Sequence, residues 1–104
     1  MEACIGYLTT QNKEQARTLA NALIEKRLIA CANIFDGAES IYRWEGKTEV
    51  AQEAVLVVKT TANLRDKIVT IVKALHSYSV PCVVFYAIDG GNADYLKWIA
   101  DETR

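Results

Sequence analysis

The sequence contains one proline, one histidine and three cysteines that are far apart in the chain. Such scarce proline excludes a proline-rich linker. An odd number of widely spaced cysteines excludes a disulfide framework, so free thiols in a reducing cytosol are the simplest interpretation. There is no C-x-x-C pair and no second histidine, which excludes a structural zinc site of ordinary spacing.

Twelve basic and thirteen acidic residues give a net charge of −1. The chain therefore lacks the basic excess typical of nucleic-acid-binding proteins.

Long apolar runs are also missing, because none approaches the ~20 residues that a membrane-spanning helix needs. Residues 1–5 lack the basic segment and the small-residue cleavage site of a signal peptide. Both observations predict a cytoplasmic protein without a membrane partner. The 104 residues include 51% hydrophobic and 24% charged residues, which is the composition of a globular protein. We expect one domain spanning residues 1–104.

The first quarter of the chain predicts a strand followed by a helix. Residues 2–10 are mostly β-formers and end in a polar cluster. Asn12 is placed to cap a helix, with Gln15 at the capping-box position. Apolar residues then recur at helical spacing between residues 16 and 24. We expect this helix to continue to about Arg27.

Residues 30–60 predict a long antiparallel pair of strands. Asp36-Gly37 interrupts the first strand in the manner of a bulge or a bend. Residues 45–47 form the turn, and the return strand covers residues 48–59. Within it, residues 54–58 are all apolar, which predicts burial on both faces.

The second half of the sequence repeats the helix and strand signals. A helix is expected to begin near Asn63, with Asp66 at the capping-box position, and its apolar stripe continues to residue 75. Residues 80–88 predict a strand, and Pro81 near its start favours an edge position. Asn92 is placed to cap a last helix that ends at about Asp101. The order β-α-β-β-α-β plus a C-terminal helix predicts an α+β, ferredoxin-like fold.

The predicted sheet carries more apolar surface than two helices can cover. In the strand over residues 80–88, apolar side chains alternate on both faces, for example Val84 and Tyr86 against Val83 and Phe85. Two helices cover one face, so the other face needs a partner, and a closed homo-oligomer is the commonest solution. The free edge of the long hairpin also favours pairing between subunits.

Catalytic motifs are scarce, and we expect a protein that is not an enzyme. No P-loop and no G-x-S-x-G motif is present. A nucleophile pair of Cys31 and His76 stays open. Metal binding is the other chemistry that these residues offer, because imidazole and thiolate ligands at His76, Cys31 and Cys82 suit copper. The alternative for His76 is a purely structural role at a helix end.

Aromatic and charged residues cluster in the predicted hairpin. Tyr42 and Trp44 precede the polar tip at residues 45–47. They are suited either to the rim of a ligand site or to a contact between subunits. The surplus of apolar surface favours the subunit contact.

Several segments in one order resemble the signature of the CutA family of divalent-cation tolerance proteins. The resemblance covers essentially the whole chain. It rests on Ala30-Cys31-Ala32-Asn33, on Ser40 through Lys47, on Glu53, on Lys59-Thr60, on His76-x-Tyr78-x-x-Pro81, and on Gly91-Asn92-x-Asp94-Tyr95-Leu96-x-Trp98.

The resemblance implies a cytoplasmic homotrimer of ferredoxin-like subunits, similar in architecture to the PII signalling proteins. It also implies binding of divalent metal ions, copper in particular, and a role in metal tolerance without a firmly attached reaction. The chain departs from the family pattern at four positions. Ser77 replaces the usual proline, Cys82 replaces the usual acidic residue, and Leu8 and Leu75 stand where some metal-binding members have a cysteine and a second histidine.

An alternative function follows from the PII-like architecture. A regulatory trimer of this kind would bind a small anionic ligand or a protein partner in clefts between subunits. Lys59, Glu53, Tyr42 and Trp44 would line such a cleft, because charge and aromatic walls together suit a compact polar ligand.

Overall fold

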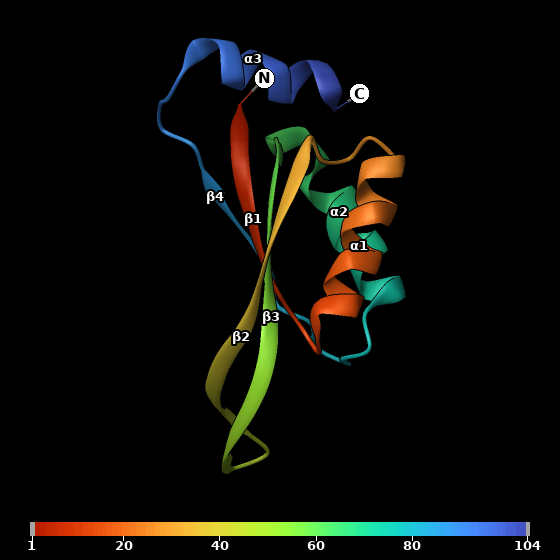
Figure 1. Cartoon of the computed structure of the whole chain (residues 1–104), viewed down its shortest axis with the longest axis vertical. Coiled ribbons are helices and arrows are strands. Elements are labelled where there is room, and N and C mark those ends of the chain that lie inside the picture. Colours follow the sequence, from red (N-terminus) through yellow and green to blue (C-terminus); the bar gives the residue numbers. More distant parts are fainter. Residues whose placement is uncertain (1, 104) are drawn as a thin grey trace.

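The computed structural model describes residues 2–103. Its centre is one antiparallel sheet of four strands in the order β2-β3-β1-β4 (Figure 1). The order of elements is the ferredoxin-like order that the sequence predicts, followed by a C-terminal helix. The elements are β1 (Ala3–Thr10), α1 (Lys13–Glu25), β2 (Cys31–Trp44), β3 (Lys47–Thr61), α2 (Arg65–Leu75), β4 (Val83–Ala87) and α3 (Ala93–Glu102).

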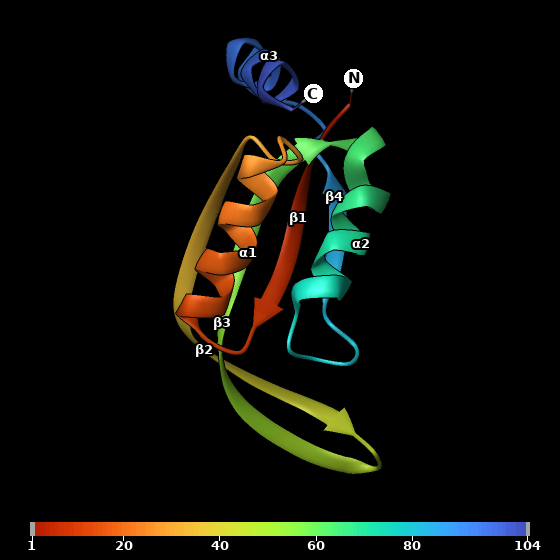
Figure 2. The same ribbon diagram turned by 90° about the vertical axis from the view of Figure 1, so that its right-hand side faces the viewer.

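Helices α1 and α2 lie side by side on one face of the sheet (Figure 2). The core between them and the sheet consists of fully buried aliphatic side chains, among them Leu8, Leu19, Leu23, Leu56, Val58, Ile68 and Val72. Helix α1 begins where the sequence predicts, because Asn12 Oδ1 accepts a 2.8 Å hydrogen bond from the Gln15 backbone N–H. The Gln15 side chain in turn accepts from the Gln11 N–H at 2.8 Å.

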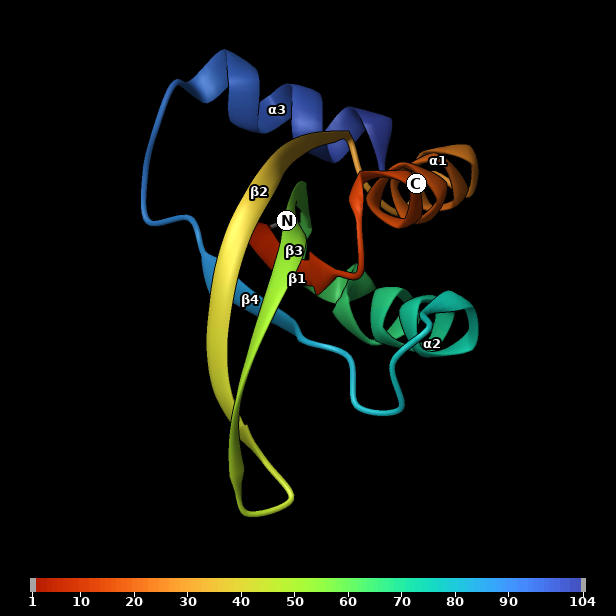
Figure 3. The same cartoon turned by 60° about the horizontal axis from the view of Figure 1, so that its bottom comes forward.

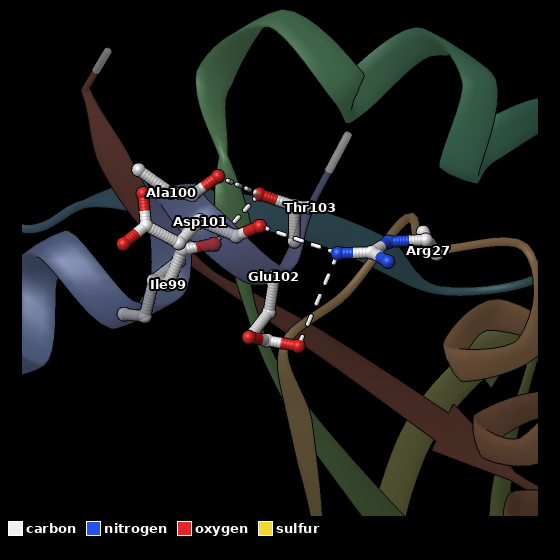
Figure 4. Close-up of polar contacts among 6 residues, drawn as sticks. All are labelled: Arg27, Ile99, Ala100, Asp101, Glu102 and Thr103. Carbon is white, nitrogen blue, oxygen red and sulfur yellow. Dashed lines mark hydrogen bonds and ion pairs between the residues drawn. The ribbon is translucent and has the colours of Figure 1, made fainter.

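The residues just after α1 also contact the end of α3. Arg27 adopts a left-handed backbone conformation with φ of 59° just after the helix. Its guanidinium donates to the carbonyl oxygen of Asp101 at 3.3 Å and lies 4.0 Å from the Glu102 carboxylate (Figure 4). Helix α3 lies across one end of the sheet rather than over its open face (Figures 1 and 2). The fully buried Ile99 belongs to the packed side of this helix.

Helix α2 begins later than the sequence predicts. A 3-10 turn occupies Ala62–Leu64, and the α-helix starts at Arg65. Leu64 is the N-cap and makes no side-chain capping bond, so the predicted capping box at Asn63 and Asp66 does not form. Asp66 still lies in the first turn, where the helix dipole favours a negative charge.

Strands β2 and β3 form a long twisted hairpin that projects beyond the body of the molecule (Figure 3). It contributes to a longest dimension of 44 Å. The predicted bulge is confirmed by the register shift between Phe35 and Ala38. The turn is shorter than predicted: Trp44 pairs with Lys47, so Glu45 and Gly46 alone make the turn. Their φ values of 49° and 78° are those of the tight turn that matches strand twist.

The sheet face opposite α1 and α2, which we call the outer face, is largely open. Phe35, Val84 and Tyr86 are 59%, 46% and 61% exposed on it. Burial of residues 54–58 on both faces is only half confirmed. Ala54, Leu56 and Val58 are fully buried beneath the helices, whereas Val55 and Val57 on the outer face are partly exposed.

Strand β4 is shorter than predicted, because it covers Val83–Ala87 instead of residues 80–88. Pro81 has no N–H to donate to a ladder, which explains why pairing starts only after it. The edge position of this strand is confirmed. Among residues 2–103, no helix is long and apolar enough to cross a membrane.

Candidate functional site

A pocket of about 380 Å³ lies where the end of β1, the bulged hairpin and the segment between α2 and β4 meet. Its walls combine three aromatic rings with hydroxyl groups, one thiol and one carboxylate. The lining residues are Thr9, Ser40, Tyr42, Trp44, Glu53, Tyr78, Ser79, Val80 and Cys82.

The bulge in β2 determines which side chains reach this pocket. Phe35 pairs with Val55 before the bulge, and Ala38 pairs with Glu53 after it. The additional residue in β2 exchanges the faces of all later β2 side chains. As a result Ser40, Tyr42 and Trp44 share the face of Glu53. Without the bulge, Ile41 and Arg43 would occupy that face instead.

Among the described residues that line the pocket, Glu53 carries the only carboxylate. The residue is 8% exposed, although it lies on a hairpin whose tip is open to solvent. Tyr78 Oη donates a 2.7 Å hydrogen bond to Glu53 Oε2. Burial of the phenol, followed by this bond and the negative charge of Glu53, raises the pKa of Tyr78 to about 12. The phenol is therefore a stable hydrogen-bond donor at neutral pH.

His76 lies behind the pocket and positions Tyr78. Its Nε2 donates to the Thr9 carbonyl oxygen at 2.8 Å, and its Nδ1 accepts from the Tyr78 backbone N–H at 3.0 Å. A backbone N–H can only donate, so Nδ1 is the acceptor and the proton of the neutral ring is on Nε2. The backbone N–H of His76 also closes α2 by donating to the Val72 carbonyl. The structural role at a helix end is thus observed, and both ring nitrogens are engaged.

The two cysteines predicted as metal ligands lie far apart in the subunit. Cys31 begins β2, half buried, with its Sγ 3.4 Å from Tyr95 Oη. Cys82 lies in the pocket wall at the opposite end of the sheet. The two cysteines are separated by three strand spacings across the sheet and by about four residues along the strands. Together these separations give a distance of about 20 Å. His76 accompanies Cys82 at that far end, so the structure does not bring Cys31 and His76 together as a nucleophile pair.

No group of three or more His, Cys, Asp or Glu side chains within residues 2–103 is arranged to hold a metal ion. A metal site built from His76, Cys31 and Cys82 stays a prediction, and a single subunit does not assemble it.

One subunit brings together only part of the residue set predicted for the anion cleft between subunits. Tyr42, Trp44 and Glu53 do meet in one pocket, but Lys59 does not line it. The Lys59 ammonium instead donates to Asn33 Oδ1 on the neighbouring strand. The pocket wall in the described chain thus carries the negative charge of Glu53 without the cation that an anionic ligand needs. A small anionic ligand in a cleft between subunits therefore stays a prediction, because a single subunit does not form that cleft.

Three pocket residues were not identified as site residues from the sequence: Thr9, Ser79 and Val80. Thr9 lies in a predicted strand without a motif, and Ser79 and Val80 occupy the unspecified positions of His76-x-Tyr78-x-x-Pro81. Tyr78 was part of the family resemblance, through its spacing from His76, but its contact with Glu53 requires the folded chain.

The family model described as "CutA1 divalent ion tolerance protein" matches residues 4–102. A divalent-cation tolerance protein CutA of Thermus thermophilus is 48% identical over 99 residues, which cover 95% of this chain and 96% of that protein. The rice chloroplastic protein CutA 1 is 45% identical and is matched over 96% of this chain, which spans only 56% of the rice protein.

Solved structures agree with these matches. The crystal structure of CutA1 from Oryza sativa has a TM-score of 0.97 at 42% identity, covering 100% of this chain and 95% of that one. The structure of the divalent cation tolerance protein from Thermus thermophilus has a TM-score of 0.96 at 45% identity, covering 98% and 99%. Sequence and fold thus agree over nearly the full length. The chain belongs to the CutA1 divalent ion tolerance protein family.

Proposed function

We propose that this protein acts in tolerance to divalent metal ions by binding such ions, copper in particular, as a homotrimer. The observation that carries this proposal is the match of residues 4–102 to a family named for divalent ion tolerance. Copper suits the imidazole and thiolate ligands that the chain offers. The role is one of binding rather than catalysis.

The open outer face supports the trimer. Phe35 on β2 and Val84 and Tyr86 on β4 are exposed there. They lie at three different levels along the strands of the same sheet surface. Ile41 and Val50 add a second exposed apolar pair on the hairpin, at 66% and 61%. Apolar surface of this extent is typical of an interface between subunits.

The metal ligands proposed are His76, Cys31 and Cys82, contributed by more than one subunit. Shared ligation is required because Cys31 is about 20 Å from Cys82 within one chain. His76 would exchange one of its two hydrogen bonds for the metal. The three free cysteines also support a cytoplasmic location, where thiols stay reduced.

A copper titration tests the metal proposal. The reduced, metal-stripped protein is titrated with Cu(II) against a competing chelator, beside the variants His76→Ala and Cys82→Ser. Lys73→Ala, an exposed position on α2, is the matched control. We expect tight binding that weakens in the first two variants and is unchanged in the control. Equal affinity in all four proteins would contradict these ligands.

A second candidate function is regulation by a small molecule bound in the pocket. The specific observation in its favour is the convergence of Tyr42, Trp44 and Glu53 on one cavity of about 380 Å³. Cavities of this size, with aromatic walls and few polar groups, are typical of small-ligand sites. A metabolite that changes Trp44 fluorescence when metal ions do not would support this function.

A further inference from the structure

We propose that the pocket binds a small organic cation, a protonated amine with a short apolar body, with Glu53 as the counter-ion. This inference rests on the second candidate function and specifies its ligand. It differs from the anionic ligand that the sequence suggested, because the charge in the pocket wall is negative.

The charge of Glu53 is the first argument. Glu53 is more than nine-tenths buried, and its carboxylate receives one hydrogen bond, from Tyr78. Within residues 2–103 no lysine, arginine or histidine forms an ion pair with it. A buried carboxylate without a cation is costly, since its desolvation is compensated only by hydrogen bonds. A bound ammonium group supplies the missing positive charge and donates to the carboxylate.

The aromatic walls are the second argument. Trp44 and Tyr42 line the same pocket as Glu53, and both rings are half exposed in the single subunit. The face of an aromatic ring attracts a cation, most strongly for tryptophan. Val80 adds an apolar wall for the carbon chain of the ligand, and the hydroxyl oxygens of Ser40 and Thr9 can accept hydrogen bonds from an ammonium group.

The same wall is poorly suited to a hard divalent ion. Such ions require several oxygen ligands, with carboxylates foremost. The described wall has one carboxylate, and Tyr78 already uses one of its oxygens. An organic ammonium ion needs only one charged acceptor together with apolar surface. The oxygen donors of the wall thus favour the organic cation over a hard divalent ion.

The test uses n-butylammonium, with sodium butyrate and 1-butanol as probes of equal chain length and with magnesium chloride as the metal probe. Binding to the assembled protein is measured by calorimetry and by Trp44 fluorescence in a Trp98→Phe background, which leaves Trp44 as the one tryptophan. Glu53→Gln removes the charge and keeps an oxygen that accepts from Tyr78. Glu49→Gln, on the same strand face but outside the pocket wall, is the matched control.

We expect n-butylammonium to bind and the neutral and anionic probes not to bind. Because a charge-assisted hydrogen bond contributes about 1.5–3 kcal/mol, Glu53→Gln is expected to weaken binding by about tenfold or more. Glu49→Gln is expected to leave the affinity unchanged. Trp44→Leu, a change at a half-exposed position, is expected to weaken binding as well and does not depend on the packing around Glu53.

Other outcomes would overturn the proposal in distinguishable ways. Preferential binding of butyrate would exclude a cation site but keep the second candidate function. Binding of magnesium alone, lost in Glu53→Gln, would assign the pocket to a metal ion. Binding of none of the probes would exclude both the cation site and the small-molecule function, as expected when a basic side chain of a second copy fills the pocket. The copper titration is a separate measurement that reports on His76 and Cys82, although Cys82 also lines this pocket.

Discussion

Tyr78 Oη lies 2.7 Å from Glu53 Oε2, although the two residues are 25 positions apart in the sequence. Glu53 comes from the long hairpin, and Tyr78 comes from the segment between α2 and β4. Their hydrogen bond thus ties the projecting hairpin to the body of the subunit. It also places a protonated phenol against a buried carboxylate in the wall of the pocket.

This contact predicts a loss of stability at alkaline pH. The Tyr78 pKa of about 12 in the folded protein exceeds its ordinary value of 10.0. The protonated phenol is therefore favoured by folding, and its contribution is complete below pH 10 and is lost as the pH rises to about 12. We expect the difference in unfolding free energy between wild type and Tyr78→Phe to shrink over this interval, as measured by urea denaturation.

Difference absorbance of tyrosinate between wild type and Tyr78→Phe locates the titration itself. In Glu53→Gln the Tyr78 pKa is expected to move back toward its ordinary value, because the negative charge is gone. Titration of Tyr78 at the ordinary value in the wild type would refute the proposed effect of Glu53.

Gly6 is expected to tolerate no side chain. A methyl group at this position would lie 2.7 Å from Val58 Cγ2 and 3.1 Å from Phe85 Cε1. Since both neighbours belong to adjacent strands, relief requires a shift of packed side chains. We expect Gly6→Ala to lower the unfolding free energy by about 1–3 kcal/mol. Gly90→Ala, where the methyl group meets open space, should change it by less than about 0.5 kcal/mol. Equal stability of the two variants would contradict this packing.

His76 is expected to contribute to stability whether or not it binds metal. His76→Ala leaves the Thr9 carbonyl and the Tyr78 N–H without their partner. We expect a loss of about 1–3 kcal/mol in metal-free protein, measured by urea denaturation. Lys73→Ala, exposed on the same helix, serves as the control and should stay within about 0.5 kcal/mol of wild type. A variant as stable as wild type would mean that water replaces both contacts.

Assembly through the outer face predicts a melting temperature that rises with protein concentration. Val84→Asp introduces a charge on this face, at a residue that is 46% exposed. We expect light scattering to show a smaller species for this variant and a trimer for wild type. Ile24→Asp, at a similarly exposed position on α1, should leave the assembly intact. A constant melting temperature over about a hundredfold dilution, with a monomer mass, would argue against the trimer.

Local signals predicted most of the fold. The Asn12 and Asn92 caps form as expected, because capping depends on residues two or three positions apart. The bulge at Asp36-Gly37 was likewise predicted, since a glycine there relieves the positive φ of 79°. The predictions failed where a neighbouring strand or turn decided the outcome. Examples are the late start of α2 after a 3-10 turn and the short β4.

The sequence by itself determined the order of strands and helices, the family and the presence of an uncovered apolar face. These properties depend on periodicity and composition, which are local or additive along the chain. The tertiary structure alone decided that Glu53, Tyr78 and Trp44 share a pocket, that Lys59 lies outside it, and that both nitrogens of His76 are occupied. The reason is physical: strand register and one bulge fix which faces meet, and register depends on pairings between residues far apart in the sequence.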